Sequence, residues 1–192
     1  MAMKSTTFAG LALAGLLAAG VADARPANNV ADPQAPRALP AEGPVQVQWN
    51  DPAGFTELRY SRNRWEARRG DWVTKLAEHL RKRASGQLPE GQQLAVTITD
   101  IKRAGDYEPW HGSQMDDVRF MRDIYPPRIS LQFILTDAQG RVLDQGERKL
   151  VDSGYLYGST RLSDTDPLRY EKRLLDDWLR RELREDRATA GL

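Results

Sequence analysis

The chain has no cysteine among its 192 residues. This absence excludes disulfide scaffolds, thiol nucleophiles, zinc ribbons and iron–sulfur clusters. Histidine is nearly absent too, because His79 and His111 are the only two and lie far apart in the sequence. A nucleophile elbow, a phosphate-binding loop and a dinucleotide fingerprint are all missing. The sequence therefore carries no standard catalytic signature, and we expect no cofactor.

Neither sign of charge is in large excess, since 28 lysines and arginines face 27 acids and the net charge is +1. This balance disfavours a general nucleic-acid binder. One local excess exists, because residues 57–83 hold nine basic side chains and four acidic ones. We favour a solvated helix face as its explanation. The alternative is a binding patch for anionic envelope polymers or lipid headgroups.

The N-terminus has the pattern of a signal peptide over residues 1–24. A short start containing Lys4 precedes an apolar run over residues 6–21, and Ala22 and Ala24 stand where a signal peptidase reads small residues. The run is too short, and too rich in glycine and alanine, for a comfortable membrane span. We expect cleavage after Ala24, no stable membrane insertion afterwards, and a periplasmic or secreted protein.

The remaining chain divides into three parts by composition. Residues 25–44 are rich in proline and alanine and predict a disordered linker. Residues 45–185 carry the apolar periodicity and predict a single domain. Residues 186–192 have nothing to bury and predict a flexible tail.

Residues 128–151 predict a β-hairpin. Apolar and polar side chains alternate along residues 129–136, which is typical of a strand with one buried face. Gly140 supplies a turn, and the chain returns toward Val151 as the partner strand. Ile134 falls on the opposite face, which indicates that this second face is partly covered as well.

The other elements complete an α+β pattern. Residues 45–49 and 94–98 alternate as strands, and Asp100 marks a bulge or a strand end. Apolar stripes predict helices over residues 71–84 and after Asp166. The order β-α-β-loop-β-β-α predicts a small, mostly antiparallel sheet with two helices packed on one face. The first two strands, separated by a helix, could be parallel.

The irregular residues 102–127 would hold any chemistry that the protein performs. His111 with Glu108, Asp116 and Asp117 offers metal ligands, but without the spacing of a preformed site. Two carboxylates, from Glu108, Asp116, Asp117 or Asp123, could act as an acid/base pair in glycan hydrolysis.

We favour a structural role for these acids. In that interpretation the aspartates at 116, 117 and 123 pair with arginines and hold the loop in place by charge-assisted hydrogen bonds. The expected partners are Arg119, Arg122 and Arg128.

Aromatic side chains on glycine-flanked loops can form a binding platform, although such side chains more often fold over the core. Tyr155 and Tyr157 lie on such a loop. The candidate binding residues of the whole chain are Tyr107, Trp110, His111, Arg119, Arg122, Tyr155 and Tyr157.

Four motifs resemble a family of secreted proteins of Gram-negative bacteria, domain of unknown function 3016. They are VQVQWNDPAGFTE at residues 45–57, EPWHG at 108–112, DDVRFMRDIYPPRI at 116–129 and DPLRYEKRLLDDW within residues 164–178. The resemblance extends over residues 45–183. It implies a periplasmic protein, and it brings no site residues because the family has no assigned activity.

These observations lead to three functional hypotheses. The first is a non-catalytic binding or accessory module of the cell envelope, whose partner is an envelope protein, peptide or glycan. The second is an envelope hydrolase for glycan or peptide that uses the carboxylates of residues 102–127. The third is a structural subunit of an envelope assembly, which would expose an apolar patch. The sequence leaves the oligomeric state open.

Overall fold

The computed structural model describes residues 30, 32–157 and 165–189, with side chains as far as residue 183. The predicted signal peptide lies outside the described residues. The strands are β1 (Val45–Trp49), β2 (Gln93–Lys102), β3 (Asp106–Tyr107), β4 (Arg119–Phe120), β5 (Arg128–Thr136) and β6 (Val142–Val151). The helices are α1 (Thr56–Tyr60), α2 (Arg64–Arg68), α3 (Trp72–Ser85) and α4 (Arg169–Thr189), with 3-10 turns η1 (Pro52–Gly54), η2 (Pro109–His111) and η3 (Ser113–Met115).

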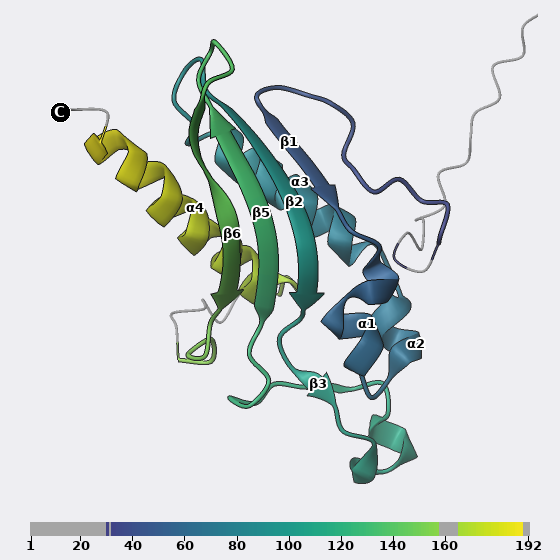
Figure 1. Cartoon of the computed structure of the whole chain (residues 1–192). Helices are drawn as coiled ribbons and strands as arrows, with labels where there is room; N and C mark the ends of the chain where they lie inside the picture. The colour runs from purple at the N-terminus through teal and green to yellow at the C-terminus, as the bar shows by residue number, and fades with distance from the viewer. Residues whose placement is uncertain (1–29, 31, 158–164, 190–192) are drawn as a thin grey trace, which may run out of the picture.

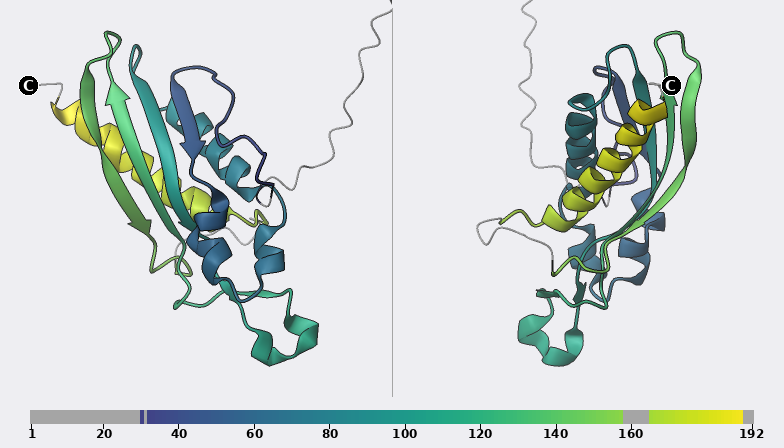
Figure 2. Two further views of the ribbon diagram at one scale, coloured as in Figure 1. Left: turned by 45° about the vertical axis from the view of Figure 1, so that its right-hand side comes forward. Right: turned by 90° about the vertical axis from the view of Figure 1, so that its left-hand side faces the viewer.

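A four-stranded sheet in the order β1-β2-β5-β6 forms the body of the molecule. β1 and β2 are parallel, whereas β2, β5 and β6 pair antiparallel. α3 and α4 contact each other and lie on the same face of the sheet (Figures 1 and 2). The predicted α+β class with a small, mostly antiparallel sheet is confirmed.

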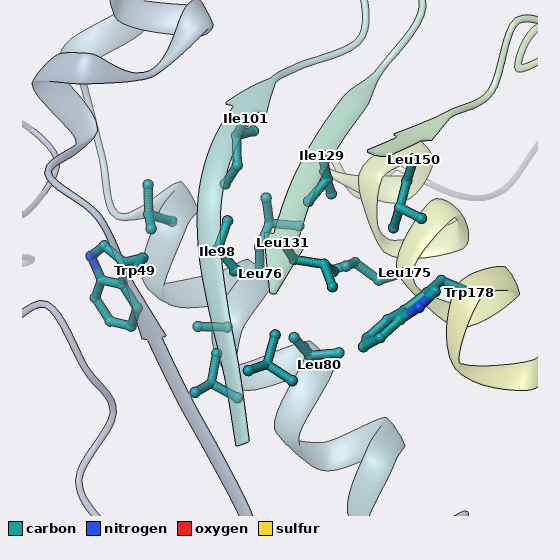
Figure 3. Close-up of a cluster of buried hydrophobic side chains, with 14 of the residues drawn as sticks. Trp49, Leu76, Leu80, Ile98, Ile101, Ile129, Leu131, Leu150, Leu175 and Trp178 are labelled. Carbon is teal, nitrogen blue, oxygen red and sulfur yellow. The ribbon is translucent and has the colours of Figure 1, made fainter. Parts of the chain in front are cut away.

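The core lies between the sheet and these two helices. Leu76 of α3 and Leu175 of α4 are fully buried and meet the central strands at Leu131 (Figure 3). Trp178 packs its ring edge-on against Phe133, with 5.8 Å between ring centroids. The apolar stripes that predicted the helices are therefore the surfaces that the sheet covers.

The hairpin agrees with the prediction in both strands and in its turn. Gly140 has φ = 79°, the left-handed conformation that the turn requires. Of the two alternatives predicted for Asp100, a register shift between Ile98 and Asp100 favours the bulge, since β2 continues to Lys102. Ile134 lies on the second sheet face and is 45% exposed, so its surface is partly covered, as the sequence predicts. Both long helices lie on the other face of the sheet (Figures 1 and 2).

The prediction of a disordered linker is wrong for residues 32–44. Ala38 forms an antiparallel bridge with Gln48, and the Leu39 amide donates to the Val47 carbonyl at 3.0 Å. Val30 is also buried. β1 is an edge strand with free backbone groups, so it recruits this segment as a short additional pairing. The composition predicted disorder because the segment has few apolar side chains. The hydrogen bonds that order it are made by backbone groups, which composition does not reveal.

α4 extends to Thr189, so the segment predicted as a tail begins within this helix. No helix in the described part of the chain is long and apolar enough to cross a membrane.

The lower end of the sheet carries the irregular part of the chain. α1 and α2 lie beside it, and the segment with η2 and η3 projects below (Figure 1). The side chains of Pro109 through Val118 are all exposed. β3 and β4 form a two-stranded ribbon that supports this projection.

Candidate functional site

Glu57 is the centre of a buried ion network at the lower end of the sheet. It lies in α1 with a fully buried side chain. Lys102 donates to it at 3.3 Å and Arg103 at 3.1 Å. Arg119 of β4 donates to it as well, and its guanidinium lies 4.7 Å from the centre of the Tyr107 ring. One acid thus joins α1, the end of β2 and β4.

The charges around Glu57 determine its protonation. Burial alone would raise the pKa of its carboxyl, but Arg119, Arg103 and Lys102 outweigh burial and lower the pKa from 4.5 to about 2. The Glu57 charge in turn raises the pKa of Arg119 against the opposing effect of burial. Glu57 therefore stays ionised at neutral pH, which suits a structural counterion and not a proton donor.

Asp106 extends the network toward the surface. Its side chain accepts from Arg62 at 3.1 Å, and Lys102 lies 4.0 Å away. Its other oxygen accepts from the Tyr107 amide. Asp106 is thereby held between a buried cation and an exposed one.

Glu108 forms a second cluster at the base of the projection. Its buried carboxylate accepts from Arg122 at 2.6 Å, from the Tyr125 hydroxyl at 3.0 Å, and lies 2.9 Å from His111 Nε2. Burial acts to raise the pKa of Glu108, but the hydrogen bonds from these three side chains lower it. The His111 ring stacks on Phe120 with 4.7 Å between centroids. Both carboxylate oxygens are therefore engaged.

The structure corrects the expected partners of the loop arginines. Arg119 pairs with Glu57 and Arg122 with Glu108, instead of with the aspartates of the same loop. Among the described residues, no ion pair joins Asp116, Asp117 or Asp123 to an arginine. The predicted clamp exists, but its acids are the glutamates. The reason is that the buried carboxylates of Glu57 and Glu108 need cationic partners, whereas the three exposed aspartates are solvated by water.

The metal hypothesis receives no support from this geometry. His111 and Glu108 approach each other, but Arg122 and Tyr125 occupy the remaining carboxylate positions. In the part of the chain that the structure describes, no group of three or more histidines and acids could hold an ion.

Among the acids that the structure describes, Glu171 is the buried one whose surroundings favour the neutral form. It lies in the first turn of α4 and accepts from the Ala104 amide at 2.6 Å. Its second oxygen is buried and has no hydrogen-bond partner among the described residues. Burial raises the pKa of this carboxyl.

The aromatic candidates separate into two groups by burial. Tyr155 is fully buried against Tyr170, and its hydroxyl donates to the Arg122 carbonyl at 2.9 Å. Burial raises the pKa of Tyr155 to about 12. Tyr107 is buried as well, so both tyrosines are structural and neither can form a platform. Trp110 and Tyr157 are 60% and 80% exposed.

The exposed aromatic residues gather at the lower end of the molecule. Trp65 of α2 is 68% exposed and Tyr60 of α1 is 63% exposed. Together with Trp110 and Tyr157 they are the four exposed tyrosine and tryptophan side chains among the described residues. Tyr157 joins this end through its hydroxyl, which lies 3.3 Å from Asp123.

Arginines lie among these aromatic side chains. The Arg62 guanidinium is 5.2 Å from the Trp110 ring centre, and that of Arg69 is 4.7 Å from the Trp65 ring centre. Such stacking is a cation–π interaction. We call this surface the aromatic–arginine end; its members are Arg59, Tyr60, Arg62, Arg64, Trp65, Arg68, Arg69, Trp110, Arg122 and Tyr157.

Sequence reasoning missed Glu57, Arg62, Asp106 and Tyr125. Glu57 gives no local signal because its partners lie 45 to 62 positions further along the chain. The local excess of positive charge over residues 57–83 was the usable signal for Arg62.

The fold and this end define an α+β protein whose buried acids Glu57 and Glu108 serve as counterions and whose exposed tyrosines and tryptophans lie on elements at one end of the sheet. The chain belongs to the family described as protein of unknown function (DUF3016), whose model matches residues 43–181. The match confirms the family suggested by the four motifs. A comparison with curated proteins found no match.

One similar solved structure is the crystal structure of "a putative lipoprotein from Caulobacter crescentus CB15". It is 15% identical, with 62% of this chain and 86% of that chain covered and a TM-score of 0.37. At that TM-score nothing about this chain follows from the likeness.

Proposed function

We propose that the protein is a non-catalytic binding module of the cell envelope, exported to the periplasm, which contacts an envelope component through the aromatic–arginine end. The observation that carries the proposal is the collection of the four exposed tyrosine and tryptophan side chains at one end. Large apolar side chains left in water at one place mark an interaction surface.

The buried carboxylates of Glu57 and Glu108 are ionised and paired with cations, which favours a binding role over hydrolysis. A hydrolase needs an acid that can give or take a proton near neutral pH. Glu108 has both oxygens bound and a lowered pKa, and Glu57 is held by three cations. The aspartates at 116, 117 and 123 are exposed to solvent, whereas catalytic acids typically lie in a sheltered cleft.

Retention on a purified envelope fraction tests the proposal. The full chain is expressed with export in a Gram-negative host, and its sedimentation with that fraction is measured. Replacing both exposed tryptophans, Trp65→Ser with Trp110→Ser, should lower the retained fraction about tenfold, as expected for central aromatic contacts.

The matched control removes two exposed apolar side chains elsewhere. Val142 and Leu143 are 53% and 45% exposed at the hairpin end of β6, opposite the aromatic–arginine end (Figure 1). Val142→Ser with Leu143→Ser should leave retention unchanged. Equal retention of both double variants, or no retention of the unaltered chain, would contradict the proposal.

A further inference from the structure

We infer that residues 59–69, at the aromatic–arginine end, dock on an anionic phospholipid surface. This inference rests on the proposed function and names the partner. The segment contains five arginines, no lysine and one acid, Glu66. It also presents Tyr60 and Trp65, which are among the most exposed large side chains described.

Three of the five arginines, Arg59, Arg64 and Arg68, are available to a ligand, whereas Arg62 pairs with Asp106 and Arg69 with Glu66. Arg68 has no ion pair among the described residues, and Arg64 makes only a long hydrogen bond of 3.4 Å to the Arg59 carbonyl. The Arg59 guanidinium lies 5.1 Å from the Tyr60 ring centre. Guanidinium groups bind phosphate oxygens in pairs and keep their charge at every physiological pH.

The aromatic side chains favour a membrane over a soluble anion. Tryptophan and tyrosine place an apolar ring and a polar tip at the boundary between headgroups and acyl chains. Trp110, Met115 and Val118 add further exposed apolar area on the projecting segment next to α2. Met115 and Val118 can bury apolar area in a lipid surface, but they have no aromatic ring that could stack on a sugar.

The fold presents the segment rigidly. Asn63 caps α2 by accepting from the Glu66 amide at 3.1 Å, and its side-chain amide donates to the Asp116 carbonyl at 2.8 Å. The Trp72 indole donates to the Ala67 carbonyl at 3.0 Å and fixes the other end of α2. A surface that is ordered before binding loses less entropy on docking.

Two acids lie beside this segment and oppose the docking. Asp116 and Asp117 are exposed at the end of η3, which Asn63 holds against α2. They repel an anionic surface and limit the basic area on that side. Removing the charges of the arginines should therefore weaken binding to anionic vesicles, and removing the charges of Asp116 and Asp117 should strengthen it.

The test measures sedimentation of the exported full chain with phospholipid vesicles. Vesicles of phosphatidylethanolamine and phosphatidylglycerol should bind it, and vesicles of phosphatidylethanolamine and phosphatidylcholine should bind it much less. Arg64→Gln with Arg68→Gln should weaken binding by about tenfold or more, because each basic residue near such a surface contributes about fivefold. Asp116→Asn with Asp117→Asn should strengthen binding, and added salt should weaken it in every case.

Lys82 and Lys149 provide the matched control, since both are exposed and lie away from the segment. Lys82→Gln with Lys149→Gln removes the same charge and should change binding far less. Equal binding to both kinds of vesicle, or equal losses in the two double variants, would overturn the inference. Equally tight binding to soluble polyglutamate would overturn the membrane as partner. If the chain is retained on the envelope fraction but not on vesicles, the inference fails and the proposed function stands.

Discussion

Glu57 and Arg119 stand 62 positions apart in the sequence and form a buried ion pair. The pair joins α1 to β4, and therefore fixes the short helices relative to the ribbon that supports the projection. Because Tyr60, Trp65 and Trp110 lie on these two parts, the network behind them holds these three exposed aromatic residues in place.

Replacing the central acid should destabilise the fold strongly. Glu57→Gln leaves Lys102, Arg103 and Arg119 without their shared counterion, and we expect a loss of about 3–5 kcal/mol in the free energy of unfolding. Urea denaturation followed by tryptophan fluorescence measures it. Asp177→Asn is the control, because it removes only a surface pair with Arg180 and should cost about 0.5 kcal/mol. Similar losses in the two variants would contradict the network's role.

The stability of the protein should fall in acid. The pKa of Glu57 is lower in the folded chain, about 2, than its ordinary value of 4.5. Its ionised form therefore stabilises the fold above pH 4.5, and that contribution is lost as the pH falls from 4.5 toward 2. Acid denaturation curves of Glu57→Gln should be flatter than those of the unaltered chain over this range. Parallel curves would show that Glu57 is not held ionised.

Glu171 should show the opposite dependence. Its pKa is raised by burial, so its contribution is present below the ordinary pKa and is lost as the pH rises through the folded value. Glu171→Gln keeps the acceptor for the Ala104 amide and removes the charge, so it should be at least as stable at neutral pH. Glu171→Ala removes the acceptor as well and should cost about 1–3 kcal/mol. A glutamine variant as unstable as the alanine variant would contradict this assignment.

Position 105 requires glycine for two reasons, its backbone conformation and the lack of room for a side chain. It has φ = 75°, and an added Cβ would lie 2.7 Å from the Phe120 carbonyl oxygen. Gly112 has φ = 95° but no atom within 4 Å of that position. Gly105→Ala should therefore cost about 1–3 kcal/mol more than Gly112→Ala, because the added methyl group would overpack against Phe120 of β4. Equal unfolding midpoints for the two variants would contradict the close approach.

Much of the fold could be predicted from local patterns. The hairpin, α3 and the bulge in β2 each follow from periodicity or turn residues within a short stretch. The site could not be predicted in the same way. Arg119 and Arg122 were expected to pair with aspartates nearby, whereas their partners Glu57 and Glu108 are chosen by burial, which depends on how distant segments pack. Similarly, Tyr155 and Tyr157 lie on one loop, and only packing decides that the first is core and the second is exposed.

Site-specific photocrosslinking in living cells tests the central claim most directly. A photoreactive phenylalanine analogue is placed at position 65 in α2, or at position 143 at the opposite end of β6, where Leu143 is also exposed. We expect crosslinks to an envelope component from position 65 and none from position 143. Crosslinks from position 143 alone would contradict it, because the binding surface would then lie at the other end of the molecule.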